Sequence, residues 1–290
     1  MVAYGNDRFG QLGRGHLLHS SIPIQTIGIS NVRQVSAQID FTVALKNDGT
    51  VWAWGNNYYN QLGRTRIDSS SVPIQLNILT NVIAISAGGN YAMALKSDGT
   101  VWEWGELGNE IYFEPTLVEN LTEITAISAG DFHAMALKKD GTVWAWGFNG
   151  EGELGDGTTT TSYVPVRVKN ITDVVAISAG SNFTLALKSD GTVWNVENGL
   201  MVPVKDLTNV IAISVGFFYS DHAVALKKDG TVWVYDAYPK VPIQVKNLSD
   251  VVAISAGQPT YVVPGCNLLF FNKYKLLRLF LLNEDLVGTL

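Results

Sequence analysis

The side chains that could carry acid–base or metal chemistry are few in this sequence. The chain has four histidines, which are His16, His19, His133 and His222. Asp131 lies two positions before His133, and Asp221 directly precedes His222, so an acidic residue accompanies each of these histidines. No G-x-S-x-G nucleophile motif and no P-loop accompanies these pairs. We therefore expect no catalytic set, and we interpret the chain as a protein that is not an enzyme.

A metal site is not indicated by spacing either. His16 and His19 are the one close histidine pair, and they lie in a polar segment without a nearby cysteine. Structural zinc sites usually need four Cys or His ligands, and the chain has a single cysteine, Cys266. We expect neither a metal nor a cofactor.

His133 and His222 occupy a position that recurs along the chain. Each lies three residues before the alanine of a repeated Ala-Leu-Lys stretch, and the same position elsewhere holds Phe41, Tyr91 and Phe183. Because most copies are aromatic, we favour a packing role over a functional one. The alternative is a binding role, for which the candidate residues are Asp131, His133, Asp221 and His222.

These residues are positioned by a repeat that organises the whole chain. Ala-Leu-Lys-x-Asp-Gly-Thr-Val-Trp occurs five times, with its turn glycines at Gly49, Gly99, Gly141, Gly191 and Gly230. Asp-Gly between two apolar runs predicts a hairpin with a two-residue type I′ turn, in which both central residues have positive φ. The spacing of about 40 to 50 residues is typical of a propeller or solenoid.

Each repeat supplies four predicted strands. A proline-led strand is followed by a strand ending in Ile-Ser or Val-Ser, then by the Ala-Leu-Lys strand and the Val-Trp strand. The prolines are expected at strand starts or on edge strands, because proline lacks an N–H. A glycine after the Ile-Ser strand, as at Gly88, permits a tight or positive-φ conformation, and the alanine before it permits close approach of backbones. The fold class is therefore all-β, a β-propeller of four-stranded blades.

Counting strands gives six blades, with seven blades or an incomplete ring as alternatives. Closure requires Val2–Gly5 and Pro23–Gln25 to share one blade with Val251–Ser255 and Thr260–Val263, which removes free sheet edges. The repeat domain is residues 1–263. Residues 264–290 are an apolar tail without the repeat, and this tail could be a capping strand or helix, or the product of a reading-frame error.

Charge and composition exclude several partner classes. The net charge is −6 without a basic cluster, so a nucleic-acid surface is not expected. Charged residues interrupt the apolar tail, so we expect no membrane span. The lysine before each Asp-Gly turn is matched by the aspartate, which predicts a nearly neutral edge. No secretory signal precedes the first repeat, so a complete chain would be cytoplasmic, and we expect a monomer.

The repeats resemble those of the regulator of chromosome condensation family. The resemblance rests on Ile85-Ser86-Ala87-Gly88, Ala94-Leu95, Asp98-Gly99 and Val101-Trp102-Glu103-Trp104-Gly105, and on the Gln-Leu-Gly loops, and it extends over about residues 1–263. The repeats are of the short type found in bacterial relatives. The family forms β-propellers, and acids and histidines on one face of its founding member contact a small GTPase and promote nucleotide exchange.

Two functions follow as expectations. The first is a non-enzymatic scaffold that binds a protein or peptide through loops of one propeller face, such as Asn56–Ser71 and Phe148–Ser162. The second, which the resemblance implies, is a guanine-nucleotide exchange factor for a small GTPase. Asp131, His133, Asp221 and His222 would then be the contact residues.

Overall fold

The structure is a computed structural model. It describes residues 1–38, 40–64, 67–216, 222–236, 240–246, 248 and 251–256, together with two strands at 265–272 and 275–282. The chain divides into two compact units, one of residues 1–139 with 163–165 and one of residues 140–162 with 166–290. Each unit is described below by itself.

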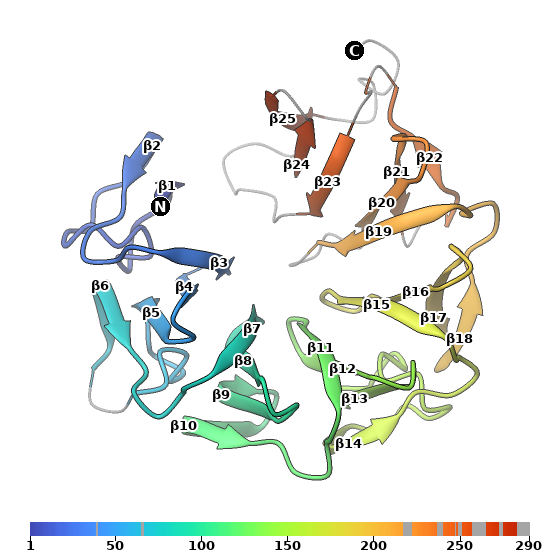
Figure 1. Ribbon diagram of the computed structural model, residues 1–290, viewed down its shortest axis with the longest axis horizontal. Coiled ribbons are helices and arrows are strands. Elements are labelled where there is room, and N and C mark those ends of the chain that lie inside the picture. Colours follow the sequence, from blue (N-terminus) through green and yellow to red (C-terminus); the bar gives the residue numbers. More distant parts are fainter. Residues whose placement is uncertain are drawn as a thin grey trace. The chain divides into compact units, whose positions relative to one another are not determined.

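The repeat folds into antiparallel sheets in which chain order and spatial order agree (Figure 1). Within the described residues, five sheets have four strands: β3-β4-β5-β6, β7-β8-β9-β10, β11-β12-β13-β14, β15-β16-β17-β18 and β19-β20-β21-β22. Each is the predicted four-stranded blade. The all-β prediction and the four strands per repeat are therefore confirmed.

The strands fall into the four predicted types. The first strands are the Ile-Ser type: β3 (Val32–Ala37), β7 (Val82–Ala87), β11 (Ile124–Ala129), β15 (Val174–Ala179), β19 (Val210–Val215) and β23 (Val251–Ala256). The second strands are the Ala-Leu-Lys type: β4 (Phe41–Lys46), β8 (Asn90–Lys96), β12 (His133–Lys138), β16 (Thr184–Lys188) and β20 (His222–Lys227).

The third and fourth strands complete each blade. The third strands are the Val-Trp type: β5 (Val51–Asn56), β9 (Val101–Leu107), β13 (Val143–Gly147), β17 (Val193–Glu197) and β21 (Val232–Asp236). The fourth strands carry the proline: β6 (Ser69–Gln75), β10 (Glu110–Leu117), β14 (Ser162–Arg167) and β18 (Leu200–Pro203), whereas β22 (Ile243–Gln244) begins directly after Pro242.

The prolines of β6, β10, β14 and β18 lie on edge strands, as one of the two predicted alternatives requires, whereas Pro242 precedes its strand. The fourth strand is at the end of every four-stranded sheet, where a missing N–H costs no ladder hydrogen bond. The other alternative, a position at the strand start, is wrong for Pro73, which lies near the end of β6. The register of β5 and β6 shifts between Ala53 and Gly55, so an irregular ladder accommodates the proline.

The Asp-Gly turns differ from the predicted type I′ turns. Among the turn residues 47–49 only Gly49 has a positive φ, of 78°. The N–H of Gly49 donates to the carbonyl of Lys46 at 3.0 Å, and the N–H of Lys46 donates to the carbonyl of Thr50 at 3.0 Å. This is a three-residue loop with a type I turn and a G1 bulge. Asp48 favours it, because Oδ1 of Asp48 accepts from the N–H of Thr50 (3.1 Å) and from Oγ1 of Thr50 (2.6 Å).

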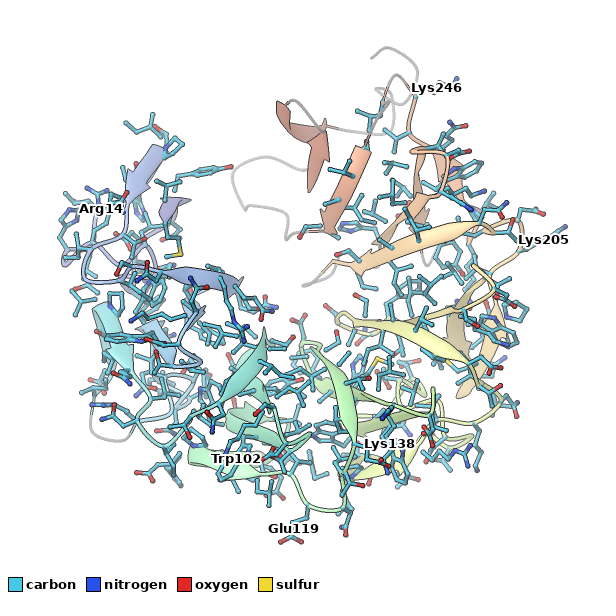
Figure 2. The ribbon with its side chains drawn as sticks, viewed as in Figure 1. Arg14, Trp102, Glu119, Lys138, Lys205 and Lys246 are labelled. Atoms are coloured by element: carbon cyan, nitrogen blue, oxygen red, sulfur yellow. The ribbon has the colours of Figure 1, made fainter. Side chains whose placement is uncertain are left out.

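The core of unit 1 lies between successive sheets. Val43 and Leu45 of β4 pack in one cluster with Ile85 of β7 and Trp104 of β9, and all four are buried. Figure 2 shows side chains filling these spaces, with Glu119, in the connection after β10, directed outward. Apolar residues on both faces of a strand follow from such packing. In unit 2, Leu185 of β16 packs in the same way in a cluster with Val210 and Ala223.

A hydrogen bond to a serine hydroxyl links the first strands of neighbouring blades. Oγ of Ser36 accepts from the N–H of Ala87 at 2.9 Å, and Oγ of Ser86 accepts from the N–H of Ala129 at 2.9 Å. In unit 2, Oγ of Ser178 accepts from the N–H of Val215 at 3.0 Å. The serine of the Ile-Ser strand therefore satisfies an edge N–H of the following blade.

The predicted shared blade at the two ends of the chain stays a prediction. In the described part, β1 (Val2–Gly5) pairs with β2 (Ser20–Gln25) in a two-stranded sheet. β23 pairs with β24 (Gly265–Asn272), which pairs with β25 (Lys275–Leu282), so tail residues form strands. Residues 260–263 lie outside the described residues, and so do 283–290. None of the described residues forms a helix long and apolar enough to cross a membrane.

Candidate functional site

Each blade has two ends with different roles. The Asp-Gly turn joins the second and third strands at one end, which we call the turn end. The first–second and third–fourth connections lie at the opposite end, which we call the loop end. Asp131 belongs to the connection between β11 and β12, and His133 is the first residue of β12, so both lie at a loop end. Loops on a rigid sheet scaffold commonly carry binding residues.

Glycines bring two loop-end connections of unit 1 into backbone contact. The N–H of Gly89 donates to the carbonyl of Gly130 at 3.3 Å. A Cβ on Gly88 would lie 2.5 Å from the carbonyl oxygen of Gly130 and 2.2 Å from the ring of Tyr91. Gly88 does not have a positive φ. A positive φ, one of the two conformations predicted for this glycine, is therefore wrong at Gly88, where the glycine is needed because the backbone of the next connection lies so close.

His133 is fully buried, at the repeat position that holds an aromatic residue in most other copies. It is 0% exposed, and Tyr91 in the same position of β8 is also 0% exposed. The backbone carbonyl of His133 accepts from the hydroxyl of Tyr91 at 2.7 Å and from the N–H of Gly130 at 2.8 Å. This position therefore ties the β8 blade to the following connection through packing and backbone bonds. A partner cannot touch this imidazole unless the connection moves.

Asp131 lies beside the same tyrosine. It is 2% exposed, and Glu103 of β9 is 4% exposed. Burial raises the pKa of the Tyr91 hydroxyl well above 10.0, and the negative charges of Glu103 and Asp131 raise it further. The structure thus brings two carboxyl groups near one buried tyrosine, which stays protonated at any physiological pH.

Glu103 also contacts a second tyrosine. The hydroxyl of Tyr112, in β10, donates to the Glu103 carboxylate. Burial raises the pKa of Tyr112, and the charge of Glu103 and this hydrogen bond add to the increase. We call Tyr91, Glu103, Tyr112 and Asp131 the tyrosine–carboxylate cluster. Its hydroxyls and carboxylates can hold a loop end in one geometry, and they offer no activated nucleophile.

The second predicted pair is only partly described. His222 is 7% exposed, and burial lowers its pKa from 6.5 to about 4. The imidazole is therefore neutral at pH 7 and cannot form an ion pair there. Asp221 lies outside the described residues. His222, like His133, fills the aromatic position of its repeat.

Two residues at this loop end were missed by sequence reasoning. Phe132, between the two predicted residues, is 47% exposed, which is unusual for a phenylalanine flanked by buried neighbours. Glu103 replaces the small alanine that Ala53 and Ala145 supply at the same strand position. That departure from the repeat was a readable signal, because a carboxylate in a buried strand position needs polar partners.

The long loops have a common hydrogen-bonded framework. In the loops after β1, β5 and β13, the N–H of a leucine donates to Oδ1 of an Asp or Asn five residues earlier: Leu12 to Asp7 (2.9 Å), Leu62 to Asn57 (2.8 Å) and Leu154 to Asn149 (2.9 Å). The buried leucines anchor each loop to its blade. The hydrogen bonds that recur in all three loops fix the loop backbone, while the side chains that point to solvent differ from one loop to the next.

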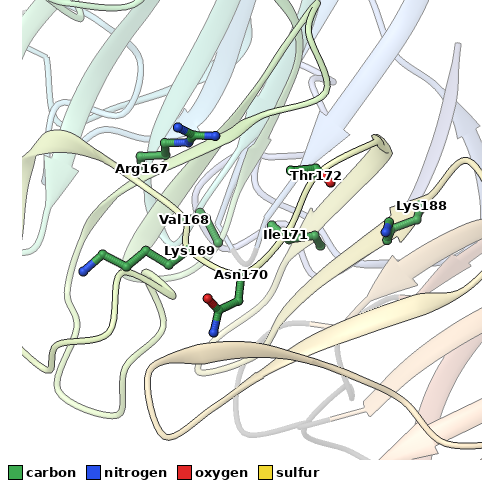
Figure 3. Close-up of a pocket in the computed structure, with 7 residues that line it drawn as sticks. All are labelled: Arg167, Val168, Lys169, Asn170, Ile171, Thr172 and Lys188. Carbon is green, nitrogen blue, oxygen red and sulfur yellow. The ribbon is translucent and has the colours of Figure 1, made fainter.

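A surface pocket of about 490 Å³ lies in unit 2, at the turn end of its blade (Figure 3). The connection from Val168 to Thr172 lines it, together with Arg167 and Lys188. Figure 3 shows Lys169 and Lys188 on either side of Asn170 and Ile171, so these cations do not converge on one point. No group of three His, Cys, Asp or Glu side chains in the described ranges could hold a metal ion.

Sequence comparison identifies the repeat. The family model of the regulator of chromosome condensation (RCC1) repeat matches residues 48–95 and 140–187, and a second model of this repeat matches residues 32–61 and 124–153. No curated protein sequence matches the chain significantly.

Solved structures share the fold at low identity. Yeast RCC1 (Prp20) bound to Kap60 is 18% identical with a TM-score of 0.78, and the match covers 94% of this chain and 76% of that one. Human WBSCR16 is 19% identical with a TM-score of 0.76, covering 89% and 79%. Prp20p from Saccharomyces cerevisiae is 19% identical with a TM-score of 0.76, covering 98% and 86%. The blades of this chain are therefore those of an RCC1-type β-propeller.

Proposed function

Because this chain belongs to the regulator of chromosome condensation (RCC1) repeat family, we propose that it is a non-enzymatic scaffold. The scaffold binds a protein or peptide partner through the loop ends of its blades. The observation that carries this proposal is the contrast at the loop ends between a uniform buried framework and exposed side chains that vary from copy to copy.

Unit 1 illustrates this contrast. In the loop after β5, Asn57 and Gln61 are buried, whereas Tyr58 between them is 75% exposed. The N–H of Tyr58 donates to Oδ1 of Asn56 at 2.9 Å, so a fixed backbone presents the ring. Phe132 is exposed at the connection between β11 and β12. Aromatic side chains on a fixed backbone are favourable contact residues in protein interfaces, because they bury a large area at little entropic cost.

The related structures support a protein as the partner class. One describes yeast RCC1 bound to Kap60, and the other describes the binding of Prp20p to Gsp1p and histones. The present chain carries a net charge of −6. An acidic scaffold attracts a partner with a basic surface and repels an acidic one, so we expect a basic protein or peptide segment.

The guanine-nucleotide exchange hypothesis comes second. It rests on family analogy, and three of its four proposed contact residues, Asp131, His133 and His222, are buried. Release of a fluorescent nucleotide from a panel of small GTPases tests it directly. Acceleration that Phe132→Ala abolishes would favour exchange, and an unchanged release rate across the panel would count against it.

Site-specific photo-cross-linking tests the scaffold proposal. A photoreactive residue is placed at position 58 or 132, both at loop ends, and as a control at Ile78. Ile78 is 53% exposed in the connection between β6 and β7, at the turn end. We expect cross-links to one partner from positions 58 and 132 and none from position 78. Cross-links from position 78 alone would contradict the assignment to the loop ends.

A further inference from the structure

The loop after β1 differs chemically from its two counterparts at one buried atom. Asp7 stands where the other long loops have Asn57 and Asn149. The bonds of the loop are otherwise equivalent: the N–H groups of Gly10, Asn60 and Gly152 donate to the carbonyls of residues 7, 57 and 149 at 3.1, 3.0 and 3.1 Å. The side chain of residue 7 is therefore held as the two asparagines are, with Oδ1 accepting from a leucine N–H.

In the loops after β5 and β13, the side-chain amide nitrogen of the asparagine donates to backbone carbonyl oxygens. Nδ2 of Asn57 donates to the carbonyls of Arg64 and Ile67, both at 2.7 Å. Nδ2 of Asn149 donates to the carbonyls of Thr158 and Thr160, at 3.1 and 3.0 Å. The amide hydrogens thus neutralise two carbonyl dipoles and close the later half of the loop.

Asp7 places an oxygen at this position. The residue is 0% exposed, and its Oδ2 has no hydrogen-bond partner among the described residues. The loops after β1 and β5 have the same length between their glycine and proline, so Arg14 and Leu17 correspond to Arg64 and Ile67. A buried, ionised carboxylate oxygen without a donor is strongly unfavourable, so either a proton or a cation must neutralise it.

The nearby histidines do not supply that charge through a hydrogen bond. Nδ1 of His19 accepts from the N–H of Asp7 at 3.1 Å, so this nitrogen carries no proton. Nδ1 of His16 is buried and has no hydrogen-bond partner among the described residues. Since no three acidic or His/Cys side chains cluster in the described residues, backbone oxygens would have to complete any ion site here.

We propose that the Asp7 loop binds a hard divalent cation of the Ca²⁺ class. The ligands are Oδ2 of Asp7, the carbonyl oxygens of the later half of the loop and water. The cation takes the place of the two amide hydrogens that an asparagine, Asn57 or Asn149, donates in each of the other long loops. Carboxylate, carbonyl and water oxygens are the ligands that Ca²⁺ takes. With a single carboxylate the affinity is low, with a dissociation constant of about 10⁻⁴ to 10⁻³ M.

Thermal unfolding of the full chain tests the proposal. The protein is freed of metal with a chelator and then titrated with CaCl₂. Because the cation binds the folded loop only, we expect the Tm to rise with Ca²⁺ concentration once it exceeds the dissociation constant. Terbium luminescence excited through tryptophan gives a direct readout, because Trp54 lies against Gly13 of the same loop.

Two reciprocal variants, Asp7→Asn and Asn57→Asp, control for effects of Ca²⁺ on stability that do not arise at the Asp7 loop. Asp7→Asn restores the chemistry of the other loops, so it should fold, lose the Ca²⁺-dependent rise in Tm and lose the terbium signal. Asn57→Asp creates the proposed chemistry in the second loop, so it should gain Ca²⁺ dependence. Equal Tm values for the parent chain with chelator, Ca²⁺ or Mg²⁺ would overturn the proposal. Stabilisation by Zn²⁺ alone, abolished by His16→Ala, would also overturn it, because imidazole rather than oxygen would then define the site.

Discussion

The indole N–H of Trp104 donates to the backbone carbonyl of Gln61, 2.9 Å away and 43 residues earlier in the chain. Trp54 makes the same bond to the carbonyl of Gln11 at 2.8 Å, again over 43 residues. The second tryptophan of the Val-Trp strand therefore secures the Gln-Leu-Gly loop of the preceding repeat. Gly63 in that loop packs on the indole, since a Cβ there would lie 3.1 Å from Trp104 Cδ1. The third long loop lacks this bond, because the following Val-Trp strand has no second tryptophan and Gly155 lies against Val196 instead.

Replacing Trp104 with phenylalanine should destabilise the protein. The variant keeps an aromatic ring but leaves the buried carbonyl of Gln61 without this donor and a gap beside Gly63. We expect a loss of about 2 to 3 kcal/mol in the free energy of unfolding, measured with urea. Trp102→Phe, in the same strand, is the matched control. The side chain of Trp102 is half-buried and its indole donates to Oγ1 of Thr100 at the surface, so we expect a loss of about 0.5 kcal/mol. Equal losses would contradict the proposed role of the loop bond.

Gly88→Ala should separate two connected blades. The new Cβ would meet both the ring of Tyr91 and the carbonyl oxygen of Gly130, and backbone cannot yield as a flexible side chain can. We expect a destabilisation of about 1 to 3 kcal/mol in urea unfolding. Gly150→Ala is the control, because the atoms nearest to its Cβ belong to the ring of Phe148, a side chain that is 41% exposed and not backbone. A neutral Gly88→Ala variant would show that the two connections can move apart without cost.

The pH dependence of stability should report the buried His222. Its folded-state pKa is lowered to about 4 by burial, below the value of 6.5 expected in the unfolded chain. Between these values the unfolded state binds more protons, so acidification favours unfolding. We expect His222 to cost about 3 kcal/mol at most as the pH falls from 6.5 to 4, with no further change below that.

The His222→Phe variant isolates this contribution. Phenylalanine fills the same position in β4, as Phe41, so the fold should tolerate it. The difference between the urea-unfolding free energies of parent and variant should change with pH only between about 4 and 6.5. A pH-independent difference would show that His222 is accessible to protons in the folded protein.

Repetition is the reason the blades could be predicted from sequence. Five copies of one strand pattern identify turns, strands and chain order, because an assignment made for one copy can be checked against the other four. The Asp-Gly turn was assigned the wrong type, because the deciding bonds from Thr50 to the Asp48 carboxylate are side-chain contacts. Closure could not be derived locally either, since it depends on pairing between the two ends of the chain.

The candidate site was predicted less well than the fold. Asp131 and His133 were identified by a recurring position, but whether that position faces a partner or the core depends on the packing of the next blade. The contact between Glu103 and Tyr112 depends on an irregular register, which shifts between Tyr112 and Thr116 in β10. A bulge of this kind leaves no clear periodicity in the sequence. The exposed Phe132 could not be distinguished from its buried neighbours without the structure.

Glu103→Ala should change the ionisation of Tyr112 and leave the blade intact. Ala53 and Ala145 occupy the same strand position in other copies, so the backbone accepts alanine there. The variant removes both the nearby negative charge and the hydrogen-bond acceptor that raise the pKa of Tyr112, so that burial and the smaller effects of Glu110 and Tyr163 remain. An alkaline absorbance titration of tyrosine should therefore show Tyr112 ionising closer to pH 10 than in the parent chain, and the pKa of Tyr91, which the Glu103 charge also raises, should fall as well. Tyr112→Phe, combined with Glu103→Ala, should remove the Tyr112 ionisation from the titration. An unchanged titration would mean that Glu103 and Tyr112 are not in contact in solution, and the tyrosine–carboxylate cluster would have to be redrawn without Tyr112.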